Sequence, residues 1–194
     1  MPSNLTLMKD FIISLFKEKL PPTYYYHNYG HTAYVMEKAV EIGRQENCSA
    51  EEINLLMVAA LWHDAGYVTT YAGHEEAGCV LARQYLPAYG FSTAAINSIC
   101  GMIMATKIPQ TPRTKLEEII ADADMEYLGT AHAAAQAENL FREWHHLNPS
   151  LTKEAWNRVQ VDFIQQHHYF TSYCKLHKEH TKQAYLDKLK KEIQ

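Results

Sequence analysis

An all-α fold is the class that this sequence of 194 residues predicts. Apolar side chains recur every three or four residues through most of the chain, and Pro, Gly and capping residues separate these segments at helix-sized intervals. No two neighbouring segments have the alternating pattern of a β-hairpin. A chain of this length can bury one core well and is short for two, so we expect a single helical domain over residues 1–194.

Helix boundaries follow from local signals. The segment from Leu5 to Phe16 has apolar residues at helical spacing, and Pro21–Pro22 end it. Ser49 and Glu52 form a capping-box pattern ahead of an apolar run. Signals of the same kinds predict helices over residues 27–47, 49–62, 74–86, 93–106, 115–128 and 131–146, and a long pair from residue 152 to the C-terminus.

Composition and charge limit the functional classes. A hydrophobic fraction of 47% and a charged fraction of 21% fit a globular protein, and the net charge of −4 provides no basic field for nucleic acid. No apolar stretch is long enough to span a bilayer, and the N-terminus has no signal-peptide pattern. The four cysteines are scattered without a C-x-x-C pair, which predicts free thiols and a cytoplasmic location.

Candidate metal ligands lie in three separated segments. His31 lies in YHNYGHTAYV, the adjacent pair His63–Asp64 in LWHDAG, and two aspartates in IIADADMEYLG. Imidazole and carboxylate ligands together suit divalent metals. Neighbouring residues on a helix point about 100° apart, but at a helix end both members of a His–Asp pair can face one ion. Asp122 and Asp124 point to nearly opposite helix faces, so only one of them is expected to be a ligand.

The order His, His-Asp, Asp resembles the HD superfamily of metal-dependent phosphohydrolases over roughly residues 24–130. This resemblance implies a helical bundle of the HD/phosphodiesterase-like type, on which helices from residues 131–194 pack. It implies a divalent metal (Mn, Mg, Zn, Ni, Fe or Co) held by His31, His63, Asp64 and Asp124. Asp122 would then support the ligands or face solvent.

The segment YHNYGHTAYV is also similar to a signature of cyclic-nucleotide phosphodiesterases. That resemblance implies that His27 is a general acid and His31 a metal ligand, although His27 could itself be a ligand because residues i and i+4 share a helix face. The residues after the doublet, AGYVTTYAGH, do not have a His and an Asn at the fixed spacing found in those enzymes. Only the metal chemistry therefore transfers.

The implied reaction is hydrolysis of a small-molecule phosphomonoester or phosphodiester, with a nucleotide as the expected substrate. The metal would acidify a water and polarise a phosphoryl oxygen. Asp64 would accept the proton of the water or bridge two ions, and His27 or His74 would protonate the leaving group. Lys107 is a candidate phosphate ligand, or else a solvated lysine. His74 with Glu75 could instead simply begin a helix.

The C-terminal region carries many histidines without a converging set of carboxylates. We expect Val159, Phe163 and Ile164 to form a core stripe there, and His167 to lie over the cleft as a substrate-binding residue of a lid. The other C-terminal histidines are expected on the surface. They are His145, His146, His168, His177 and His180.

Two rival functions remain open at the level of sequence. An HD-type oxygenase with an iron pair would need a further histidine near Thr106 to accompany His74, and none is present there. The second rival is a non-catalytic sensor that keeps the pocket for binding a metal or a nucleotide. The sequence does not define the oligomeric state, and a homodimer is one of the options.

Overall fold

The computed structural model describes residues 4–193, and all regular secondary structure in that range is helical. The predicted all-α class is therefore confirmed. The elements, in chain order, are α1 (Asn4–Lys19), α2 (Tyr29–Gln45), α3 (Ala50–Trp62), η1 (Ala65–Val68), α4 (His74–Tyr85), η2 (Leu86–Tyr89), α5 (Thr93–Ala105), α6 (Lys115–Met125), η3 (Glu126–Gly129), α7 (Ala133–Leu147), α8 (Lys153–Gln166), α9 (Ser172–His177) and α10 (Glu179–Glu192). The η elements are short 3-10 segments.

Several predicted helix starts are confirmed by side-chain caps. Asn28 caps α2 by accepting the backbone N–H of Gly30, and Ser49 with Glu52 forms the predicted capping box at α3. Ser92 caps α5 by accepting the backbone N–H of Ala95. Each cap provides an acceptor for a backbone donor that has no partner inside the helix, which fixes where the helix begins.

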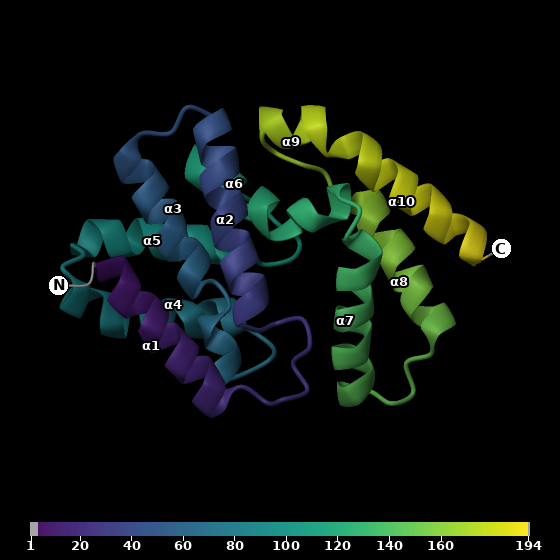
Figure 1. The fold of residues 1–194 in the computed structure, drawn as a ribbon, viewed down its shortest axis with the longest axis horizontal. Coiled ribbons are helices and arrows are strands. Elements are labelled where there is room, and N and C mark those ends of the chain that lie inside the picture. The colour runs from purple at the N-terminus through teal and green to yellow at the C-terminus, as the bar shows by residue number, and fades with distance from the viewer. Residues whose placement is uncertain (1–3, 194) are drawn as a thin grey trace.

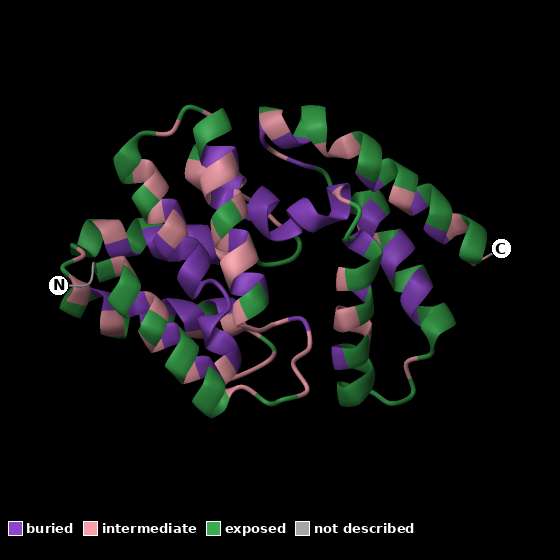
Figure 2. Ribbon diagram, in the orientation of Figure 1, coloured by how far each residue is buried: buried purple, intermediate pink, exposed green. Residues whose placement is uncertain are grey.

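The buried apolar side chains form two clusters. The larger one joins α1 to α6 and includes Trp62 and Ile120. The smaller one joins η3, α8 and α10 with Tyr26, and it includes Leu128 and Ile164. Figure 1 shows α7, α8 and α10 together on one side of the molecule, and Figure 2 shows buried residues where these helices meet the rest of the chain. The C-terminal helices thus face the segment that contains the candidate ligands.

The C-terminal region has three helices where the sequence predicts a long pair. Between α8 and α9 the chain is not helical, and Asp122 of α6 accepts hydrogen bonds from that link. The donors are the backbone N–H of Phe170 (2.9 Å), the backbone N–H of Thr171 (2.8 Å) and the hydroxyl of Thr171 (2.6 Å). The expectation that Asp122 supports the ligands or faces solvent is therefore wrong, because its fully buried side chain ties the C-terminal region to α6.

All four cysteines are free, as predicted. Cys79, Cys100 and Cys174 are buried, and Cys48 is partly buried. Within residues 4–193, no helix combines the length and apolar character that a membrane span requires.

Candidate metal centre

The four predicted ligands come together from three helices. His31 lies in the first turn of α2, and Asp124 lies near the C-terminal end of α6. His63 caps the end of α3 with helical dihedral angles, but Asp64 leaves the helix at φ −96° and ψ 3°. This change of backbone direction lets two adjacent side chains face the same point, as the sequence predicts for a helix end.

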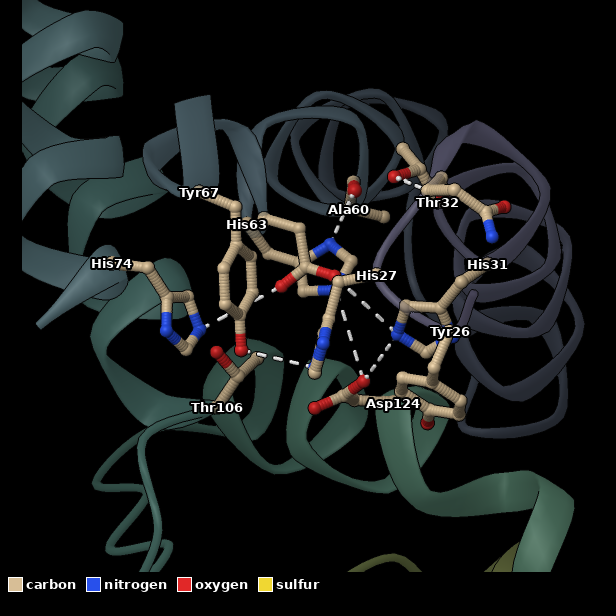
Figure 3. Close-up of polar contacts among 12 residues, drawn as sticks. Tyr26, His27, His31, Thr32, Ala60, His63, Tyr67, His74, Thr106 and Asp124 are labelled. Atoms are coloured by element: carbon tan, nitrogen blue, oxygen red, sulfur yellow. Dashed lines mark hydrogen bonds and ion pairs between the residues drawn. The ribbon is translucent and has the colours of Figure 1, made fainter. Parts of the chain in front are cut away.

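The distances define a compact cluster. One ligand atom each from His31, His63 and Asp124 lies within 4.8 Å of the others, and Figure 3 shows these three side chains pointing toward one another. His31 Nε2 is 3.0 Å from Asp124 Oδ1. Asp64 Oδ2 is 3.2 Å from His63 Nε2 and 3.6 Å from His31 Nε2. All four side chains are buried.

This donor set fits a divalent metal. His63 Nδ1 must donate its hydrogen to the carbonyl oxygen of Ala60 (2.7 Å), which directs Nε2 to the cluster. Neither His63 Nε2 nor Asp64 Oδ2 makes a hydrogen bond, although both atoms are fully buried. Buried polar atoms that make no hydrogen bond are costly in a protein interior, and these two have only charge contacts, the shortest of which joins them to each other at 3.2 Å. Two imidazoles and two carboxylates around such atoms have the chemistry of a site for Zn, Mn, Fe or a similar ion.

The protonation of the doublet reflects its burial and its charges. Burial would lower the pKa of His63, but the carboxylates of Asp64 and Asp124 and the hydrogen bond to Ala60 together outweigh it and raise this pKa to about 9. Burial would raise the pKa of Asp64, but interactions with His63, and then with His27 and His31, together outweigh it and hold the pKa well below its usual range. A divalent cation that binds to His63 and Asp64 would therefore displace the proton of His63.

Gly66 allows α4 to approach the doublet closely. A Cβ atom at Gly66 would lie 1.9 Å from the carbonyl oxygen of His74 and 2.6 Å from the backbone nitrogen of Gly78, which no structure tolerates. The glycine therefore brings the start of α4 against η1, directly after the doublet. As a result His74 Nε2 lies 3.7 Å from Asp64 Oδ1.

His27 is held by a carboxylate that the sequence analysis does not single out. Glu143 of α7 is fully buried, and its Oε1 is 2.5 Å from His27 Nδ1. Its Oε2 accepts the backbone N–H groups of Tyr26 (3.0 Å) and His27 (3.1 Å). The other ring nitrogen of His27 is 3.0 Å from the Tyr67 hydroxyl, which Figure 3 shows beside it. Burial would raise the pKa of Glu143, but these donors outweigh it and lower that pKa.

The remaining candidates occupy different positions. His74 stacks on Tyr67 with ring centroids 3.8 Å apart and lines the cavity beside the cluster. Lys107 also lines the cavity, but its ammonium group is paired with Glu76 at the surface. Thr106, where an iron-pair site would need a histidine, lines the cavity and donates its hydroxyl hydrogen to a backbone carbonyl.

The expected role of His167 is not supported by its position. It does not line the cavity, and the Lys182 ammonium group donates hydrogen bonds to its Nδ1 (3.2 Å) and to its carbonyl oxygen (2.9 Å). Burial, first, and then the charge of Lys182 lower the pKa of His167 to about 3. The other C-terminal histidines are exposed, as predicted.

A cavity of about 420 Å³ extends from the cluster to α7 and α8. That volume lies within the usual range for small-molecule sites. Val159 faces this cavity and is 39% exposed, so its predicted place in a core stripe is wrong, whereas Ile164 is buried as expected. The ligand cluster thus lies in one wall of a site large enough for a small substrate.

Sequence reasoning misses two residues of this site. Tyr67 follows the doublet by three positions and could have been noticed as a polar aromatic residue in the adjoining loop. Glu143 gives no such signal, because it lies in a polar helical segment, ENLFREWHH, that has the pattern of a solvated helix. Its partner His27 is 116 positions away, and only the packing of α7 brings the two together.

The fold and the site define an all-helical protein with a buried His/Asp centre suited to a divalent metal. The sequence profile of the HD domain family matches residues 28–125, which include all four candidate ligands, and the chain belongs to that family. A solved structure described as a predicted HD superfamily hydrolase, from an uncultured Thermotogales bacterium, has a similar fold. The TM-score is 0.66 at 22% sequence identity, over 97% of this chain and 91% of the other. Among proteins of curated function, none matches.

Proposed function

We propose that this protein is a metal-dependent phosphohydrolase that cleaves a phosphomonoester or phosphodiester of a small molecule, with nucleotides among the candidate substrates. The observation that supports the proposal best is the meeting of His31, His63 and Asp124 within 4.8 Å in the wall of a cavity. Asp64 would complete the ligand set. A metal held by these residues would acidify a water and polarise a phosphoryl oxygen.

Side chains of the protein would accept the proton of the water and donate a proton to the leaving group. Asp64 has one oxygen toward His63 and the other toward His74, so it can accept a proton in the middle of the site. His27 can give a proton to the leaving group from Nε2, because Glu143 holds Nδ1 and fixes the orientation of the ring. His74 is the second candidate for that step, and Lys107 is a candidate for binding phosphate at the edge of the cavity.

The test is hydrolysis by metal-stripped protein reloaded with Mn, Mg, Zn, Ni, Fe or Co. The panel contains an artificial monoester, an artificial diester, nucleoside monophosphates and cyclic nucleotides. Asp64→Ala should abolish both turnover and stoichiometric metal binding. Asp162→Ala, at an exposed position on α8 outside the cavity lining, is the matched control and should retain both.

Absence of turnover with every metal, despite stoichiometric binding, would contradict the hydrolase. Oxygen consumption by the iron form would then favour an oxygenase. Tight nucleotide binding without chemistry would favour a sensor.

A further inference from the structure

The side of the cavity opposite the metal centre is apolar. Helices α7 and α8 contribute to it the residues that we call the apolar wall: Leu140, Trp144, Trp156, Val159, Phe163 and Ile164. Two of these, Trp144 and Val159, remain 38% and 39% exposed. Exposed large apolar side chains that gather in a cavity commonly contact a ligand.

No charged side chain of α7 or α8 lines this part of the cavity. The polar side chain that α8 contributes is Gln160, which donates to Asn157 Oδ1 (3.1 Å) and accepts from the Tyr185 hydroxyl (2.7 Å). Lys107, which lies on neither of these helices, also lines the cavity, but it is already paired with Glu76. A negative charge against the apolar wall would therefore lose its hydration without gaining a partner.

We infer that the cavity selects phosphate esters whose leaving group is uncharged and presents an aromatic or hydrocarbon surface to the apolar wall. This inference rests on the proposed function, since the phosphate would lie at the metal centre. It implies that a second phosphate on the leaving group is rejected. Both a nucleobase and an alkyl chain have the required surface, and the test separates them.

The first experiment measures binding of alkylphosphonates, which are not hydrolysed, to metal-loaded protein by quenching of tryptophan fluorescence. Two of the three tryptophans lie in the apolar wall. From methyl- to propyl- to pentylphosphonate, affinity should rise roughly fourfold for each methylene, as expected for about 0.8 kcal/mol per buried CH₂. Pentane-1,5-bisphosphonate should bind at least about a hundredfold more weakly than pentylphosphonate.

The variants are Val159→Glu and the matched control Val80→Glu, which is 64% exposed on α4 and outside the cavity. The ratio of pentyl- to methylphosphonate affinity should fall at least tenfold in Val159→Glu and stay unchanged in Val80→Glu. An affinity that is independent of chain length, or a bisphosphonate that binds as tightly as the monophosphonate, would overturn the inference.

The nature of the leaving group is tested by comparing a nucleoside 5′-monophosphate with pentyl phosphate as substrates. The substrate with the higher kcat/KM shows whether a nucleobase or an alkyl chain contacts the apolar wall. The corresponding nucleoside triphosphate should be the poorest substrate in either case. Chain-length dependence of phosphonate binding without any hydrolysis would refute the hydrolase and leave the apolar wall supported. Hydrolysis without chain-length dependence would refute the apolar wall alone.

Discussion

Replacing Asp122 by alanine should strongly destabilise the protein without removing a metal ligand. The buried carboxylate accepts hydrogen bonds from three donors in the link between α8 and α9. Hydrogen bonds to a charged group contribute about 1.5–3 kcal/mol each, which would sum to about 5–9 kcal/mol. Burial, however, raises the pKa of Asp122 in spite of these donors, so desolvation of the carboxylate offsets part of the gain. We therefore expect Asp122→Ala to lower the free energy of unfolding by about 3–5 kcal/mol.

The assay is urea unfolding followed by circular dichroism, together with metal binding measured on the folded protein. Asp122→Asn keeps one acceptor oxygen and should lose about half as much stability. Asp162→Ala should stay within about 0.5 kcal/mol of the parent protein. Asp122→Asn should retain stoichiometric metal, whereas Asp124→Asn should lose it. A loss below about 1 kcal/mol for Asp122→Ala, or loss of metal in Asp122→Asn, would refute this assignment of the two aspartates.

Three further predictions concern the site. Gly66→Ala should lower the free energy of unfolding in urea by about 3 kcal/mol or more, because its Cβ would overlap the backbone of α4. The control is Gly101→Ala, whose Cβ meets only the Glu117 side chain. A loss of about 3 kcal/mol in this control as well would refute the reason given for Gly66. Since the raised pKa of His63 is about 9, its charge stabilises the metal-free protein fully below about pH 6.5 and this stability is lost as pH rises through 9. Calorimetry in buffers of different ionisation enthalpy should show that metal binding at pH 7 releases a proton, with affinity rising roughly tenfold per pH unit up to that pKa; pH-independent affinity would contradict the protonated doublet. Glu143→Gln should lower kcat about 10- to 100-fold with stoichiometric metal retained, and an unchanged kcat would exclude the positioning of His27.

Local patterns in the residues were sufficient for most of the helices, and the resemblance of the ordered His, His-Asp and Asp segments to a known family supplied the candidate ligands. Helical spacing and caps such as Ser49 with Glu52 depend on contacts within three or four positions, which a sequence displays directly. The doublet His63–Asp64 could be interpreted in the same way, because the turn at Gly66 follows immediately. The sequence also showed that Asp122 and Asp124 lie on nearly opposite faces of α6. It did not show which residues Asp122 contacts.

The partners of these residues depend on packing between distant segments. Glu143 reaches His27 across 116 positions, and Asp122 meets Thr171 across 49. The apolar wall has the same helical periodicity as a core stripe, so sequence alone does not distinguish a residue that faces a cavity from one that faces a core. Such contacts arise from how α7 and α8 are oriented against the ligand-bearing helices, and that orientation is the sum of many weak, nondirectional apolar contacts rather than of any local signal.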